Sequence, residues 1–272
     1  MSATQRAVPA ATGTFAPRPG AAPLGRQVLA QARMEARLTL RNGEQLLLAV
    51  VIPVIVLIGG VLAADRVGLD LEATPVDVFT PGVLALAVMS TAFTSLAIAT
   101  GFERRYGVIK RLGTSPLPRS GLLAGKVLAL LLVEVLQVAV IAAVALALGW
   151  RPVPGADGSA LGAVTGSVLA VVLGTAAFAS LGLFVAGVLR AEATLAAANL
   201  VYLLLMAGGA VVLPASAYGG FGEVVGWLPS GALGGAMRDA LIDGQVAWPA
   251  LLVLAAWTVV GTVATARTFT WE

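Results

Sequence analysis

The sequence contains no cysteine and no histidine, and charged residues make up only 11% of its 272 residues. Without cysteine and histidine, a protein has no thiol chemistry, no disulfide and few ways to bind zinc or haem. Histidine is also the commonest general base in enzymes, so mechanisms that depend on it are excluded. Soluble domains carry about a quarter charged residues, so the low charge points to a lipid environment. We therefore expect an integral membrane protein.

Long apolar segments dominate what is present. Hydrophobic residues make up 58% of the chain, and the mean hydropathy is +0.94. About 20 helical residues cross the hydrocarbon core of a bilayer, and backbone groups in lipid need internal hydrogen bonds. The apolar runs are continuous rather than alternating, which favours helices over a barrel. The sequence thus predicts an all-α membrane protein with six transmembrane helices, over residues 45–64, 79–101, 127–149, 161–189, 194–213 and 247–266.

The basic residues predict the orientation of these spans. If the N-terminus lies inside the cell, 14 of the 17 Lys and Arg residues fall on the cytoplasmic side, as the positive-inside rule requires. Both termini are then cytoplasmic. Residues 1–23 are rich in Ala, Pro, Thr and Gly and are expected to be a disordered tail.

A helical pattern begins at Leu24 and runs to Arg41, before the first span. Its arginines occupy an arc of about 80° on a helical projection, with Glu35 opposite them. The segment is either a positively charged flank or an amphipathic interfacial helix on the inner leaflet, and both descriptions can hold together. The arginines concerned are Arg26, Arg33, Arg37 and Arg41.

The loop from Glu103 to Lys126 is basic and rich in helix-breaking residues. Gly107 is expected to end one helix, and Pro116 and Pro118 to end any short helix before them. Composition alone fits either a positive-inside loop or a rigid segment that presses on a cytoplasmic partner. The order of residues resembles the coupling region of type-2 ABC transporter permeases, E-R-x-x-G-x-[IL]-x-x-L-x-x-[ST]-P-[LV]-x-R followed by Lys. The matching residues are Glu103, Arg104, Gly107, Ile109, Leu112, Ser115, Pro116, Leu117, Arg119 and Lys126.

A second likeness lies between the fifth and sixth spans. The segment 214–246 resembles the outer part of these permeases, where a turn at a proline precedes two short re-entrant helices. Pro214, Trp227, Pro229 and Arg238 occupy the expected places, whereas Leu228 stands where the family usually has Asn.

The resemblance implies a non-catalytic six-span permease domain over residues 24–272, in the inner (plasma) membrane of a bacterium. A second permease copy, identical or related, and two copies of a separate ATP-binding cassette ATPase would complete the transporter. ATP and Mg²⁺ would bind that ATPase, so this chain needs no cofactor or metal. The decoy Gly121-Leu-Leu-Ala-Gly-Lys126 is one residue short of a phosphate-binding loop and is followed by Val127. The residues that the resemblance assigns to ATPase coupling are Glu103, Arg104, Gly107, Arg111, Pro116 and Arg119.

Polar residues inside the spans are candidates for the substrate path. Glu134 is ionisable and lies well inside the third span, with Gln137 one turn away. It could form a structural hydrogen bond, contact substrate or carry a proton. Two polar stripes, on the second and fifth spans, could line a path at the seam of a permease dimer or simply pack between helices. They consist of Thr91, Thr94 and Ser95, and of Asn199, Tyr202 and Met206.

The fourth span has a stripe of small residues at every fourth position. Gly162, Gly166, Ala170 and Gly174 predict a close-packing face rather than a transport site.

Three functions remain open at this point. A path with few charges favours the permease of an exporter for a hydrophobic or amphipathic compound, such as a drug, an antibiotic or a lipid, and hence a role in drug efflux and antibiotic resistance. An ion-gradient-driven secondary transporter using Glu134 is the alternative, although the paired broken helices typical of such proteins are not apparent in the sequence. A membrane enzyme or assembly factor is the third.

Overall fold

The computed structural model describes residues 22–41, 43–67, 74–112, 114, 117–152 and 158–269; residues 1–21 of the expected disordered tail lie outside these ranges. Over the described ranges the chain is helical and contains no strand, so the predicted all-α fold class is confirmed. The elements are α1 (Leu24–Arg41), α2 (Gly43–Val67), α3 (Pro75–Met89), the π-helix η1 (Ser90–Ser95), α4 (Leu96–Arg105), α5 (Val108–Leu112), α6 (Arg119–Ala147), α7 (Ala160–Val188), α8 (Ala191–Gly208), the 3₁₀ helix η2 (Ala215–Phe221), α9 (Gly222–Gly226), α10 (Pro229–Leu241) and α11 (Trp248–Thr268).

Five helical segments in the described ranges are long and apolar enough to cross a membrane. The first predicted span corresponds to α2, in which Ala49–Ala64 is a shorter apolar stretch. Helices α3, η1 and α4 follow one another without a break and form one of the five segments. The five are Pro75–Arg105, Ser120–Ala147, Ala160–Val188, Ala191–Gly208 and Trp248–Thr268.

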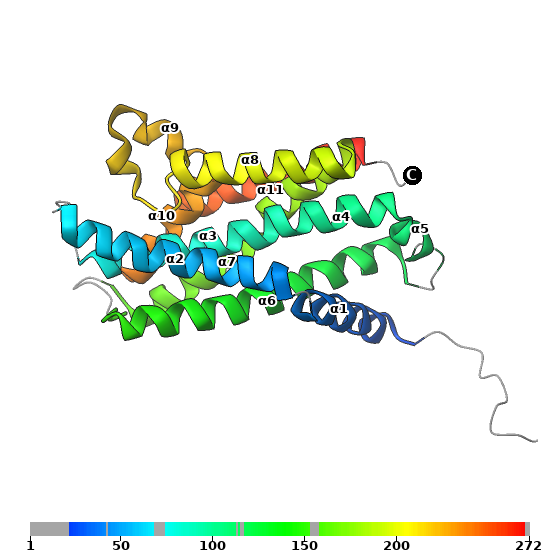
Figure 1. Cartoon of the computed structure of the whole chain (residues 1–272), viewed down its shortest axis with the longest axis horizontal. Coiled ribbons are helices and arrows are strands. Elements are labelled where there is room, and N and C mark those ends of the chain that lie inside the picture. The colour runs from blue at the N-terminus through cyan, green and yellow to red at the C-terminus, as the bar shows by residue number, and fades with distance from the viewer. Residues whose placement is uncertain are drawn as a thin grey trace, which may run out of the picture.

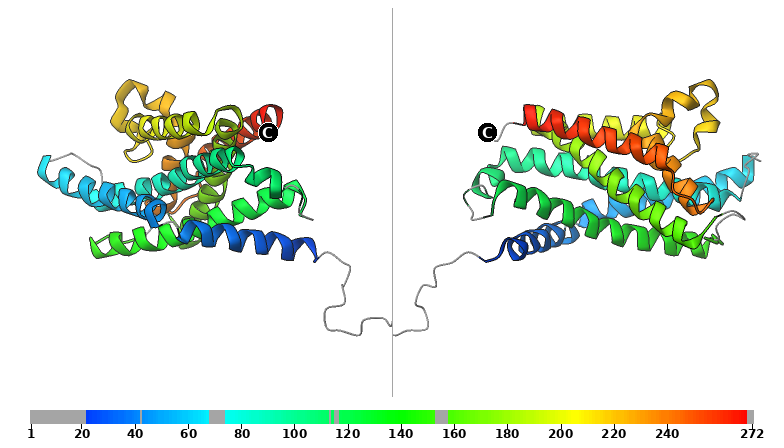
Figure 2. Two further views of the ribbon diagram at one scale, coloured as in Figure 1. Left: turned by 45° about the vertical axis from the view of Figure 1, so that its right-hand side comes forward. Right: turned by 180° about the vertical axis from the view of Figure 1, so that it is seen from behind.

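The long helices run side by side between two distinct ends of the molecule (Figure 1). At one end lie α5, the start of α1 and the end of α11; we call this the loop end. At the other end lie η2 and α9, which project beyond the bundle, and we call this the hairpin end (Figures 1 and 2). The loop end therefore carries the segment that resembles a coupling region.

Helix α3 forms the centre of the bundle. Almost every residue from Val76 to Met89 is buried, and the helix contacts α2, α6, α7 and α10. Helix α11 instead packs mainly on α7 and has only three buried residues, Leu251, Leu254 and Gly261. Burial of an apolar helix on all sides places it in the core of the membrane domain, whereas α11 presents most of its surface outward.

The predicted small-residue face of α7 is confirmed. A Cβ atom on Gly166 would lie 2.9 Å from Cβ of Ala240, and one on Gly174 would lie 2.7 Å from Cδ1 of Leu233. Both partners belong to α10, so these glycines let α7 and α10 approach closely. The opposite face of α7 exposes bulky residues such as Leu161 and Val164.

Helix α8 is shorter than the predicted fifth span. It ends at Gly208, and the chain continues to Leu213 without helical structure. Ala210 has φ of 51°, a left-handed conformation that a right-handed helix cannot include. The cause is tertiary, because the carbonyl groups that follow Gly208 bind a side chain of α10, as described below.

Candidate functional site

The loop end presents a short helix held between two sharp breaks. Gly107, with φ of +67°, ends α4, and α5 begins at the next residue. Ile109 of α5 is buried, whereas Lys110 and Arg111 are exposed. Helix α5 therefore anchors itself through Ile109 and turns its two positive charges outward.

Two further residues that the resemblance assigns to coupling, Pro116 and Arg119, lie near the start of α6. Pro116 lies outside the described residues. Arg119 is the first residue of α6, directly after Pro118, which has the extended conformation of an N-cap. A proline at this boundary fits the start of a helix, because N–H groups there have no acceptor within the helix and a missing N–H costs nothing.

Glu103 does not face outward. Its Oε1 atom lies 2.7 Å from Nζ of Lys126, and the same ammonium group lies 3.1 Å from Oε1 of Glu35 on α1. The Nε2 atom of Gln31 also donates to Oε1 of Glu35, at 2.9 Å. We call Glu35, Glu103 and Lys126 the ion cluster; it joins α1, α4 and α6.

Arg104 and Arg105 bind two other helices. Nη1 of Arg104 donates to the carbonyl of Ala186 on α7, and its guanidinium lies 6.0 Å from the centre of the Phe269 ring. Arg105 pairs with Glu192 at the start of α8. These two side chains are 50% and 63% exposed, so the pair contributes little stability. The end of α4 is thus tied to several neighbouring helices.

The predicted polar stripe of the second span falls on η1. Thr91, Thr94 and Ser95 all belong to this six-residue π-helix, where the helical hydrogen bonds are rearranged. Sequence periodicity did not predict the π-helix, although such turns occur frequently at functional sites. Thr91 is buried and donates to Oε1 of Gln137 at 2.8 Å, and Nε2 of Gln137 donates to the carbonyl of Ala49 at 2.9 Å.

Glu134 lies in the interior of the helix bundle, and the residue is only 1% exposed. Oγ1 of Thr175 on α7 donates to its Oε2 at 2.7 Å. The other oxygen, Oε1, has no hydrogen-bond partner among the described residues. Glu134 therefore joins α6 to α7, one turn away from the contact that Gln137 makes with η1 and α2.

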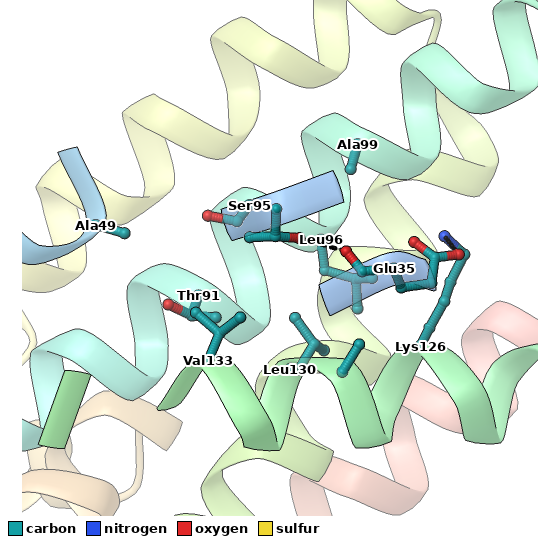
Figure 3. Close-up of a pocket in the computed structure, with 11 residues that line it drawn as sticks. Glu35, Ala49, Thr91, Ser95, Leu96, Ala99, Lys126, Leu130 and Val133 are labelled. Carbon is teal, nitrogen blue, oxygen red and sulfur yellow. Dashed lines mark hydrogen bonds and ion pairs between the residues drawn. The ribbon is translucent and has the colours of Figure 1, made fainter. Parts of the chain in front are cut away.

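A small pocket of about 60 Å³ opens between α1, α2, η1, α4 and α6 (Figure 3). Thr91 and Ser95 lie on one side of it, and Glu35 and Lys126 of the ion cluster lie toward the loop end. Apart from Thr39, the remaining lining is aliphatic. Drug-sized ligands usually occupy about 300–1,000 Å³, so this pocket could hold only one end of such a molecule.

The polar stripe of α8 approaches the stripe of η1, because α8 packs on η1 and α4. Its three members differ in environment: Tyr202 is buried, Met206 is partly buried and Asn199 is exposed. An exposed amide in the middle of a membrane helix is costly in lipid and suits a contact with another helix or an aqueous path.

At the hairpin end, Arg238 of α10 is buried and binds the non-helical segment after α8. Its Nη2 atom donates to the carbonyl of Val211 at 2.9 Å and to that of Val212, and its Nη1 atom lies 3.4 Å from the carbonyl oxygen of Ala210. These bonds satisfy carbonyl groups that the end of a helix leaves free. Arg238 therefore fixes the end of α8.

Among the described residues, no group of three or more acidic, His or Cys side chains is arranged to hold a metal ion.

The contacts that the sequence did not predict are long-range ones, namely those of Lys126 with Glu35 and of Gln137 with Ala49. The loop motif did include Lys126, but gave it no partner.

Comparison with known proteins gives one match, to a family model. No curated protein matches the chain significantly. The family model described as ABC-2 type transporter matches residues 26–228, which include the ion cluster, the π-helix, the pocket and α8. Because this match covers most of the chain, the protein belongs to the ABC-2 type transporter family as a membrane-embedded transport subunit that is not itself a catalyst.

Proposed function

We propose that the chain is the permease subunit of an ATP-driven exporter. In this proposal two permease copies, identical or related, associate with two copies of a separate ATP-binding cassette ATPase in a bacterial plasma membrane. Binding and hydrolysis of ATP and Mg²⁺ belong to the ATPase. Both termini and the loop end face the cytoplasm, which agrees with the excess of Lys and Arg on that side.

The observation that carries this proposal is the construction of the loop end. Helix α5 joins two apolar membrane helices and exposes Lys110 and Arg111 while burying Ile109. The end of α4, from which α5 follows, is bound to α6, α7 and α8 through Glu103, Arg104 and Arg105. A force applied to α5 thus reaches several spans through direct contacts.

For the cargo we propose a hydrophobic or amphipathic compound, such as a drug, an antibiotic or a lipid. The six candidate path residues on η1 and α8 offer hydroxyl groups, an amide, a phenol and a thioether, and none of these six side chains is charged. Such a lining suits a cargo that partitions into the bilayer better than an ion or a sugar nucleotide.

Charge reversal on α5 tests the ATPase contact. Arg111→Glu should leave membrane insertion and folding intact, because the side chain is exposed. It should weaken co-purification with the ATPase and lower the ATP hydrolysis of the complex. Charges at the rim of a protein interface influence how fast and how specifically the two proteins associate. Arg267→Glu at the exposed end of α11 is the matched control. Normal ATPase association of the Arg111 variant would contradict the assignment of α5 as the docking helix.

The competing function is transport driven by an ion gradient through Glu134. Its energy source distinguishes it from the proposed function. Inside-out vesicles that carry the purified complex receive a fluorescent amphipathic dye in the outer solution, together with either ATP or an imposed proton gradient, each with and without a protonophore. An exporter driven by ATP should move the dye only when ATP is present and should tolerate the protonophore. Movement that survives ATP depletion and stops with the protonophore would favour the alternative.

A further inference from the structure

Lys126 occupies a special place in the loop that resembles a coupling region. The chain has only two lysines, Lys110 and Lys126. Lys110 is exposed on α5, whereas the side chain of Lys126 is only 12% exposed and contacts two carboxylates. One of these belongs to Glu103, so the first and last residues of the loop bind each other at 2.7 Å. This ion pair closes the neck of the loop.

The second carboxylate adds α1 to the same point. Oε1 of Glu35 lies 3.1 Å from Nζ of Lys126, and the side chain of Glu35 is only 15% exposed. Partial burial reduces screening by water, so each charge interaction is stronger here than at the surface. Removal of the ammonium group would leave two carboxylates close together without their shared cation.

Close packing between α1 and α6 brings the charges into reach. A Cβ atom on Gly125 would lie 2.6 Å from Cγ of Gln31, and one on Gly121 would lie 3.5 Å from Cδ1 of Leu24. Figures 1 and 2 show α1 alongside the first half of α6. The buried face of α1, formed by Gln31, Ala32 and Ala36, thus belongs to the protein rather than to lipid.

We infer that Lys126 is a positioning residue that closes the neck of the coupling loop and fastens α1 to it. As a result α1, the end of α4, α5 and the start of α6 move as one body when the ATPase acts on α5. This inference rests on the proposed function, and it assigns α1 a mechanical role beyond membrane anchoring. The close-up in Figure 3 shows the ammonium group of Lys126 directed at Glu35.

The absence of cysteine makes the motion measurable by spin labelling. Cysteines introduced as Ala30→Cys on α1 and Val108→Cys on α5 occupy exposed positions. The labelled permease is assembled with its ATPase in lipid nanodiscs. Distances between the two labels within one protomer are then measured by pulsed electron paramagnetic resonance, without nucleotide and in the vanadate-trapped state; dilution with unlabelled permease removes distances between protomers.

Two changes at the ion cluster are compared. Lys126→Arg keeps the cation and should preserve its effect. Lys126→Met alone leaves two unpaired carboxylates and could misfold, so the informative variant combines it with Glu35→Gln and Glu103→Gln, which removes the ion cluster without leaving a buried charge. Arg267→Met is the matched control, because it removes an exposed cation at the same end of the molecule that lies outside α5 and outside the ion cluster.

The inference predicts one label distance, unchanged by nucleotide, in the unsubstituted protein, in Lys126→Arg and in Arg267→Met. In the triple variant the distance should broaden and shift between the two nucleotide states, and stimulation of ATP hydrolysis by the permease should be lost. A residue that only stabilises the fold would lower the melting temperature without making the distance depend on nucleotide. An unchanged distance in the triple variant overturns the inference alone. A permease that binds no ATPase overturns the proposed function and, with it, the inference.

Discussion

Gly82 on α3 offers a sharp test of the packing at the hairpin end. A Cβ atom at this position would lie 2.8 Å from the carbonyl oxygen of Val211 and 2.8 Å from Nη2 of Arg238, and it would come closer still to the carbonyl oxygen of Val212. Two of these contacts are to backbone atoms, which cannot rotate away. The Gly82→Ala substitution should therefore push the non-helical segment away from Arg238.

The size of the effect follows from two opposing contributions. Overpacking a tight core costs about 1–3 kcal/mol, and contacts with fixed backbone oxygens place Gly82→Ala near the upper limit. Replacing Gly by Ala inside a helix returns about 1 kcal/mol. We therefore expect a net loss of about 2 kcal/mol in the free energy of unfolding, which for a protein of this size lowers the melting temperature by about 4–8 °C.

Gly59→Ala on α2 is the matched control, because a Cβ atom there would meet nothing within 4 Å. The same chemical change should leave stability unchanged or raise it by up to about 1 kcal/mol. Melting of both variants in detergent can be followed by the loss of the monodisperse peak in size-exclusion chromatography. Equal melting temperatures for Gly82→Ala and Gly59→Ala would refute the proposed position of the segment against α3.

Further substitutions probe the buried polar contacts. Thr175→Val removes the hydroxyl that binds Glu134 and should cost about 0.6 kcal/mol, and at most about 1.7, in a melting assay. Glu134→Gln keeps an acceptor for that hydroxyl and should fold; an altered range of transported dyes would show a role in transport, and an unaltered one a structural role. Gln137→Leu loses two hydrogen bonds that join α6 to η1 and α2, and it should destabilise the protein more than Thr175→Val in the same assay. Arg238→Met leaves three carbonyl groups without their donor and should increase proteolysis of the hairpin end in intact vesicles, whereas Arg238→Lys should increase it less.

The helical fold was predictable because each long apolar run has to form its own backbone hydrogen bonds in lipid. The start of the entry helix at Leu24 and its end at Arg41 were also predicted correctly, since the arginine pattern repeats with the helical period. Span bounds set by charge do not mark where a helix begins. Helix α6 begins at Arg119 rather than at 127, because Pro118 defines where the helix can start, whereas charge defines only where lipid begins.

Other features depend on partners that are far away in the sequence. The fifth span appeared to reach Leu213, but Arg238 binds the carbonyl groups of residues 210–212 from 26 to 28 positions away. Gln137 meets the carbonyl of Ala49 across 88 positions. A local pattern of polar residues shows that such a side chain needs a partner, but only the packing of helices decides which partner it finds.

The charges of the loop show most directly what folding adds to the sequence. By resemblance, Glu103, Arg104 and Arg111 form one group that contacts an ATPase, since they share one basic loop. In the structure Glu103 turns inward to Lys126 and Arg104 binds the backbone of α7, while Arg111 stays exposed on α5. One motif thus divides into residues that hold the loop to the spans and a residue that is free to meet a partner. Both parts are needed, because a docking helix that was not fastened to the spans could bind an ATPase without moving them.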